Sequence, residues 1–277
     1  MKKSELFIWI LVVTITLLVT GCTEDSTSGV DDIDDDIDDT EEPMESPVVP
    51  EATPAEIDLS YFQENSVEFQ EQYAAFLEAS GYAQAASGSL MGGLSFGEVF
   101  FGLAESSEAE FSNGEWEWTY TFSEQGETIT LRLTAAEVTD GIEWSMYISG
   151  NFGEFNQNVD EFLFISGFTA SDRSEGNWSY YYPEGGETPV MSYQWEVTSE
   201  TEYTFTSTII DPDNGNEFVI SYTRTGAENT LNYTGDDLNN DIEVYWNTDT
   251  MTGYIDNGEE IRCWDDTFAE TACAGTA

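Results

Sequence analysis

Histidine is absent from this 277-residue chain, and its only lysines are Lys2 and Lys3. Without histidine, a Ser–His or Cys–His nucleophile cannot be built, and a histidine-ligated zinc or iron site is excluded. Without lysine in the body of the chain, a Schiff base and a phosphate-binding P-loop are excluded as well. The remaining possibilities are carboxylate-pair chemistry, carboxylate-bound calcium, or binding without catalysis.

Positive charge is equally scarce, since six basic residues stand against 56 acidic ones and the formal net charge is −50. Nucleic acid is therefore excluded as a partner, because neutralising its phosphates takes clustered Lys and Arg. The acids are spread through the whole chain, which favours a surface kept soluble in a saline medium that screens their repulsion. The alternative is a surface that captures cations or basic partners.

The N-terminal apolar run, from Leu6 to Val19, is shorter than the ~20 residues of a membrane-spanning helix. A basic start, a short apolar core and small residues after it are typical of a secretory signal. The run ends in Val19-Thr20-Gly21-Cys22, which resembles the lipobox of bacterial lipoproteins. The resemblance implies that residues 1–21 are a signal peptide and that Cys22 is acylated and becomes the first mature residue. The alternative is an anchor helix that is never cut.

The resemblance also implies a location. Thr23 follows Cys22, whereas aspartate at this position retains enteric lipoproteins at the inner membrane. Glu24 and Asp25 resemble the acidic signals that send some lipoproteins to the cell surface. We therefore expect an exported protein, lipid-anchored to the cell envelope at the outer membrane, and its periplasmic or surface orientation stays open. Removing residues 1–21 takes away both lysines and one glutamate, which leaves four arginines, 55 acids and a net charge near −51.

Residues 22–56 are predicted to form a disordered, lipidated tether. They hold four of the seven prolines and the run DDIDDDIDD at 31–39. Low hydrophobicity and high charge cannot offset the entropy of ordering, and like charges extend the segment. The acidic run lacks the glycine turn and the spaced ligands of a calcium loop, so a solvated tether is the favoured interpretation.

Residues 57–110 have helical, small-residue character. Asn65 and Glu68 are spaced for a capping box, and apolar residues at 69, 73, 76 and 77 follow on one helical face. Gly81 is then expected to end this helix. The glycine-broken apolar stretch 82–104 is either a second, irregular helix or a buried connector. We expect this segment to pack on a sheet.

From residue 111 onward the apolar pattern has period two. Trp116, Trp118, Tyr120 and Phe122 alternate with polar residues, and later segments repeat this alternation between turn signals. The pattern predicts an all-β fold, an antiparallel meander of about twelve strands that forms either a barrel or a curved half-barrel with the N-terminal helices in its concavity. Alternate residues of a strand face opposite sides of the sheet, so the tyrosines that alternate with the apolar residues should be exposed: Tyr147, Tyr181 and Tyr245.

The strand region contains an internal repeat. GEWEWTY at 114–120 matches GNWSYYY at 176–182, and further matches follow in the same order. The two units cover about 114–170 and 176–225, and residues 228–264 could be a degenerate third. Chance similarity among Thr, Glu and aromatic strands is the alternative.

Cysteine is rare, with three residues in the chain. If Cys22 carries lipid, Cys263 and Cys273 remain in an exported protein, where disulfides form. We therefore predict a disulfide between them. A redox role is not indicated, although Arg262 is adjacent to Cys263.

Two residue sets are candidate sites. Asp211, Asp213 and Glu217 resemble the start of a calcium loop, but position twelve is Tyr222 instead of glutamate, and a hairpin turn is favoured. Five tryptophans of the repeated strands could stack on sugars or line a cavity for an apolar ligand: Trp116, Trp118, Trp144, Trp178 and Trp195. The alternative, favoured for Trp118 and Trp144, is core packing.

These observations predict a cell-envelope lipoprotein with no enzymatic activity, no catalytic residue, no cofactor and no resident metal. We expect it to bind an apolar or lipid-like ligand on a concave sheet, in outline similar to lipoprotein carriers with half-barrels, or to bind a partner. The alternatives are a structural or interaction protein without a small ligand, and a carbohydrate-binding lipoprotein. Its membrane contact would be through the lipid.

The net charge of −50 predicts that the stability of the folded protein depends on salt. Removing NaCl should lower the melting temperature of the folded protein, because self-repulsion among unscreened carboxylates destabilises the compact state. Thermal unfolding followed by circular dichroism from near zero to molar NaCl measures this effect. A melting temperature that does not change with salt would refute the charge argument.

Overall fold

The computed structural model describes residues 46–48, 57–124, 127–152, 157–183 and 186–273. The predicted signal peptide, Cys22 and all of the predicted tether except 46–48 lie outside these residues. In the described part, no helix has the length and apolar character needed to cross a bilayer.

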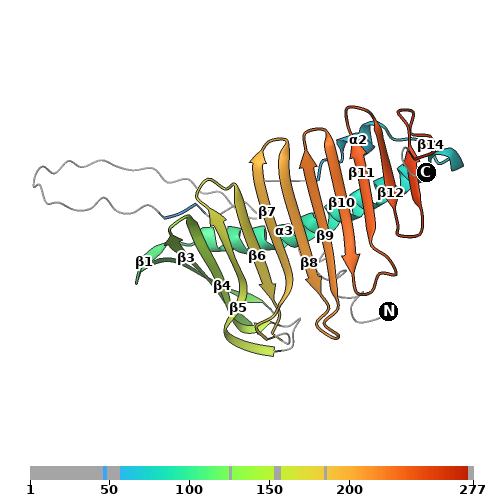
Figure 1. Cartoon of the computed structure of the whole chain (residues 1–277). Coiled ribbons are helices and arrows are strands. Elements are labelled where there is room, and N and C mark those ends of the chain that lie inside the picture. The colour runs from blue at the N-terminus through green and yellow to red at the C-terminus, as the bar shows by residue number, and fades with distance from the viewer. Residues whose placement is uncertain (1–45, 49–56, 125–126, 153–156, 184–185, 274–277) are drawn as a thin grey trace, which may run out of the picture. The chain divides into compact units, whose positions relative to one another are not determined.

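Fourteen strands form one antiparallel sheet in which each strand pairs with the next along the chain (Figure 1). The strands are β1 Glu110–Ser112, β2 Glu115–Glu124, β3 Glu127–Val138, β4 Gly141–Phe152, β5 Gln157–Ala170, β6 Glu175–Tyr181, β7 Pro189–Ser199, β8 Glu202–Ile210, β9 Glu217–Thr225, β10 Glu228–Gly235, β11 Ile242–Asn247, β12 Thr252–Asp256, β13 Ile261–Trp264 and β14 Glu270–Thr271. The predicted all-β meander is confirmed, with fourteen strands instead of about twelve. The sheet is open, and its two edges are the short strands β1 and β14.

The repeat of the sequence coincides with four-strand blocks. Its first unit falls on β2–β5 and its second on β6–β9, while 228–264 falls on β10–β13. At the end of the sheet, Cys263 in β13 and Cys273 just after β14 form a disulfide, as predicted, with an S–S distance of 2.03 Å. This bond ties the short edge strand β14 to its neighbour.

In the described residues three helical elements precede the sheet: α2 Ser60–Glu64, the 3₁₀ turn η2 Glu71–Tyr73, and α3 Ala74–Glu105. The 32-residue α3 crosses one face of the sheet, which we call the inner face (Figure 1). It contacts β2 and β3 near one edge and β11 to β14 near the other. The N-terminal helical segment therefore covers the sheet.

The predicted boundaries within this segment are wrong. Asn65 ends α2 instead of capping a helix, and its side-chain amide donates to the carbonyl oxygen of Tyr61. Phe69 is 84% exposed. The helix runs through Gly81 without stopping. Packing against the sheet stabilises α3 along its length, and this outweighs the weak helix propensity of its glycines.

The core combines small residues on the helix with large ones on the sheet. A stripe at spacings of three and four along α3 is buried: Ala75, Ala79, Ala83, Ala86 and Leu90. Alanine lets the helix backbone approach an inner face dominated by buried aromatic rings. Phe76 and Phe101 extend the contact, with ring centroids 5.9 Å from Trp264 and 4.9 Å from Trp178. At roughly 25 cal/mol per Å² of apolar area removed from water, each buried ring contributes a few kcal/mol.

Glycines on the inner face make room for tryptophans. Gly167 in β5 lies between Trp144 and Trp178 on the two neighbouring strands. Gly253 in β12 lies between Trp246 and Trp264 in the same way. A Cβ at Gly167 would lie 2.2 Å from Cε3 of Trp178, and one at Gly253 would lie 2.3 Å from Cζ2 of Trp264. The indole rings therefore occupy the space above each glycine.

The three tyrosines predicted to be exposed are half-buried. The Arg132 guanidinium lies 4.3 Å from the ring centre of Tyr147. The Tyr181 hydroxyl is 3.1 Å from Ser166 Oγ, and Tyr245 stacks on Tyr254 at 5.3 Å. Cross-strand packing on the polar face, which we call the outer face, accounts for the difference.

Gly167→Ala should lower the free energy of unfolding by about 1–3 kcal/mol, because the added methyl group overlaps the Trp178 ring. Gly88→Ala is the matched control, since a Cβ there meets no atom within 4 Å and lies on an exposed turn of α3. That substitution should raise stability by about 0.5–1 kcal/mol through helix propensity. Urea unfolding measures both changes, and equal effects of the two substitutions would contradict this account of the core.

Candidate functional site

The tryptophans singled out in the sequence lie mostly beneath α3. Trp118, Trp144, Trp178 and Trp195 are at most 4% exposed, and Trp116 is half-buried against Phe111, with ring centroids 5.0 Å apart. A sugar-stacking platform requires exposed rings, so the four buried indoles cannot form one while α3 stays in place. Their observed contacts are those of a core.

The calcium candidates lie in the turn between β8 and β9. Asp211 Oδ1 accepts from the backbone N–H of Asp213 at 2.8 Å, and the carbonyl oxygen of Asp211 accepts from the Gly215 N–H at 2.7 Å. Gly215 has φ +75°, as such a turn requires. Glu217 instead begins β9 and donates its N–H to Asp236 at 3.0 Å. In the part of the chain that the structure describes, no group of three or more Asp, Glu, Cys or His could hold a metal ion.

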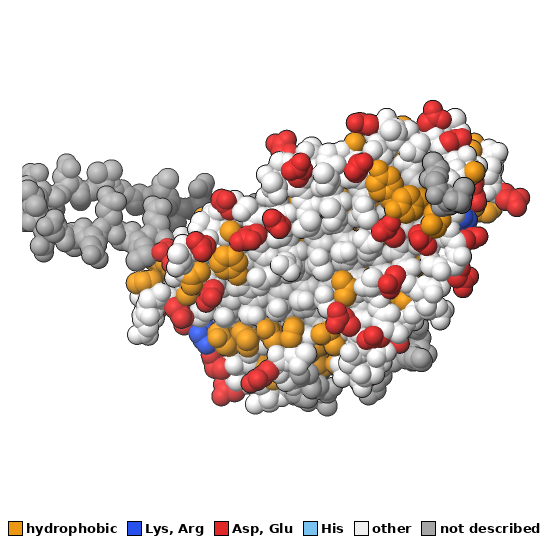
Figure 2. Space-filling model, viewed as in Figure 1, with side chains coloured by type: hydrophobic (Ala, Val, Ile, Leu, Met, Phe, Trp, Pro, Cys, Tyr) orange, Lys and Arg blue, Asp and Glu red, His pale blue; other side chains and the backbone are white. Residues whose placement is uncertain are grey.

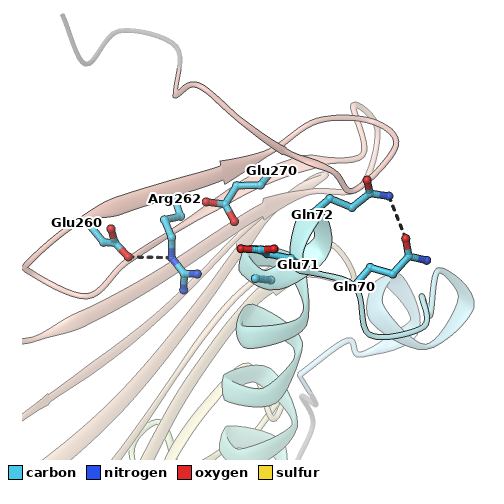
Figure 3. Close-up of a pocket in the computed structure, with 7 residues that line it drawn as sticks. Gln70, Glu71, Gln72, Glu260, Arg262 and Glu270 are labelled. Atoms are coloured by element: carbon cyan, nitrogen blue, oxygen red, sulfur yellow. Dashed lines mark hydrogen bonds and ion pairs between the residues drawn. The ribbon is translucent and has the colours of Figure 1, made fainter.

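A shallow, open depression lies where the start of α3 meets the end of the sheet (Figure 3). Its lining is polar and comprises Gln70, Glu71, Gln72, Ala74, Glu260, Arg262 and Glu270. The Arg262 guanidinium pairs with Glu78 on α3 and, at 3.3 Å, with Glu260. Since its cation is already paired with carboxylates, the depression is better explained as a joint between α3 and β13 than as a catalytic centre.

A second ion pair joins the N-terminal segment to the sheet. Arg224 Nη1 in β9 lies 3.1 Å from Asp58 Oδ2. Burial favours a higher pKa for the Asp58 carboxyl, but hydrogen bonds from Ser60 and the Arg224 charge outweigh it and hold that pKa below its usual range. Asp58 is therefore ionised at neutral pH. Sequence reasoning missed both joints, because their partners lie 166 and 184 residues apart.

The outer face differs from the rest of the surface in charge. Across the central strands most of its side chains are serine, threonine, asparagine and glutamine, with Val219 among them, and Figure 2 shows this uncharged middle between margins rich in carboxylates. No described helix or loop covers this uncharged middle of the outer face. Near one end, the Tyr254 hydroxyl donates to Glu243. Burial and the adjacent Glu243 carboxylate raise the pKa of Tyr254 well above its usual range.

Comparisons with known proteins give no relative: no protein-family model matches the chain, and neither a curated protein nor a solved structure matches it.

Arg262→Gln should lower the free energy of unfolding by about 1 kcal/mol, because it leaves the Glu78 carboxylate at the joint without its cation. Arg173→Gln is the control, since Arg173 is exposed and forms no ion pair with any described residue. Its effect should stay within about 0.5 kcal/mol. Chemical denaturation compares the two, and a loss at Arg173 as large as that at Arg262 would show that the joint adds nothing.

Proposed function

We propose that the protein is a lipid-anchored, non-enzymatic binding protein of the bacterial cell envelope, held at the outer membrane through Cys22. It contacts its partner through the outer face of the sheet. The observation that carries this proposal is the contrast between the two faces. The inner face is occupied by α3 and closely packed rings, whereas the outer face is broad, uncharged in its middle and uncovered by described residues.

Three carboxyl groups are stabilised in their ionised form by their neighbours. The carboxyls with a shifted pKa in the described residues are Asp58, Asp172 and Asp265, and each pKa is lowered. Hydrogen bonds from Ser174 and Thr267 cause the shifts of the last two. These carboxylates are thus suited to hold turns and ion pairs.

A second candidate function is binding of an amphiphile between α3 and the sheet. The indole N–H groups of Trp178, Trp195 and Trp246 are buried and have no acceptor among the described residues. A buried donor without an acceptor costs free energy, so the polar group of an inserted ligand would satisfy these donors. This binding mode requires α3 to leave the inner face.

The anchor is tested by feeding an alkyne fatty acid to bacteria that express the full chain. Label should appear on the wild-type protein in the outer-membrane fraction and be lost from the Cys22→Ala variant. An unlabelled wild-type chain would contradict the anchor.

Native mass spectrometry of the full mature chain carrying Cys22→Ser separates the two candidates. The mass of the polypeptide alone counts against the amphiphile. A co-purified lipid-like species, more abundant when Ala83→Asp weakens the packing of α3 on the inner face, supports the amphiphile instead.

A further inference from the structure

We infer that the outer face binds a neutral polysaccharide, laid across the central strands. This inference rests on the proposed function, because it names the partner class of the same face. It starts from the register of the strands, which places uncharged hydrogen-bonding side chains next to one another in rows.

The first row consists of threonines on β8, β9 and β10. Thr204 pairs with Thr223, and Thr223 pairs with Thr230. The row continues into Tyr245 on β11 and Tyr254 on β12, whose rings are stacked. It therefore joins three hydroxyls to an aromatic pair.

Two more rows run parallel to the first. One contains hydroxyls on β5 to β8, namely Ser166, Ser179, Ser192 and Thr208. The other contains amides and hydroxyls on β6 to β10, namely Asn177, Gln194, Thr206, Ser221 and Asn232. Strands lie about 4.8 Å apart and alternate residues about 6.7 Å apart along a strand, so the three rows form a staggered grid in which all three meet on β8, at Thr204, Thr206 and Thr208. Across five strands the grid spans about 19 Å, enough for several sugar units.

The threonines of the first row are available to a partner, whereas Ser166 in the second row bonds the Tyr181 hydroxyl and Tyr245 and Tyr254 donate to Glu228 and Glu243. Each hydroxyl can donate and accept, and each amide can do both. In the described part of the chain, the side chains of Thr204, Thr223 and Thr230 form no hydrogen bond with another side chain. By contrast, the outer-face hydroxyls of Thr121 and Thr130, on β2 and β3, lie 3.2 Å apart and bond each other.

The charge distribution selects the class of polymer. The chain carries a net charge of −50, so an anionic polymer is repelled. A cationic partner would be matched by carboxylates among the hydroxyls of the grid. The carboxylates of these rows stand at its ends instead, with Glu196 paired to Thr204 and Glu243 paired to Asn232. A neutral polymer that offers many hydroxyls fits the grid, and the apolar faces of its rings fit the stacked tyrosines.

A second copy of the chain fits less well. Two molecules of this charge repel each other, and pairing the grids would place hydroxyls against hydroxyls without burying an apolar anchor of the kind that stabilises protein interfaces. A dimer that forms in the absence of glycan is accordingly an outcome that counts against the inference.

Affinity electrophoresis of the full mature chain carrying Cys22→Ser tests the inference. The gels contain one of four neutral polymers, namely hydroxyethylcellulose, barley β-glucan, dextran or glycol chitin, and a gel with anionic alginate is the charge control. At least one neutral polymer should retard the protein, and alginate should not.

The decisive variant is Thr204→Val with Thr223→Val and Thr230→Val, which removes three hydroxyls while keeping side-chain shape and strand propensity. Affinity should fall tenfold or more. The matched control is Thr119→Val with Thr121→Val and Thr130→Val, on the outer face but outside the grid, and it should bind within twofold of the wild type. Circular dichroism and melting temperature check that both variants are folded.

Retention by none of the four neutral polymers would overturn the inference, as would equal losses in the two variants, stronger retention by alginate, or glycan-free dimers. None of these results affects fatty-acid labelling of Cys22 or the detection of a co-purified lipid-like species by native mass spectrometry. Failure of the polysaccharide assignment is therefore distinguishable from failure of the proposed function.

Discussion

The structure depends on covering one aromatic face of an open antiparallel sheet. A closed barrel would bury such a face by itself, but here β1 and β14 remain apart as edges, so another element has to exclude water from the indole and phenol rings. Helix α3 does this with a stripe of alanines, and the small side chains let one helix contact both ends of the sheet. With the inner face occupied in this way, the outer face is the broad sheet surface that no described element covers.

Positive charge is scarce, and most of the arginines after residue 22 form ion pairs that join elements of the fold. Two of the four arginines after residue 22 bind the N-terminal segment to the sheet, through Arg224 with Asp58 and Arg262 with Glu78. A third, Arg132, pairs with Glu117 and Glu161 on the outer face. These three cations thus hold elements of the fold together.

The sequence predicts those features that follow from local pattern. Period-two alternation identifies the strands and their inner residues, turn residues identify the hairpins, and the count of cysteines identifies the disulfide. It does not predict what depends on distant contacts. The glycines of α3 indicate helix ends in the sequence, but the helix continues through them because packing on the sheet stabilises it. Gly167 and Gly253 make room for tryptophans on neighbouring strands, and the linear sequence does not show those contacts. The grid can be recognised only from the strand register, because nothing in the linear sequence distinguishes its threonines from those of other strands.

The central claim is that α3 is a permanent part of the core and not a movable lid. Native-state hydrogen exchange of the full mature chain, read by mass spectrometry, tests it most directly. The account predicts that amides of α3 between residues 75 and 90 exchange only through global unfolding, at the same opening free energy as the central strands β7 to β10. Fast exchange of α3 while those strands stay protected would show that the helix leaves the inner face, and it would contradict the account.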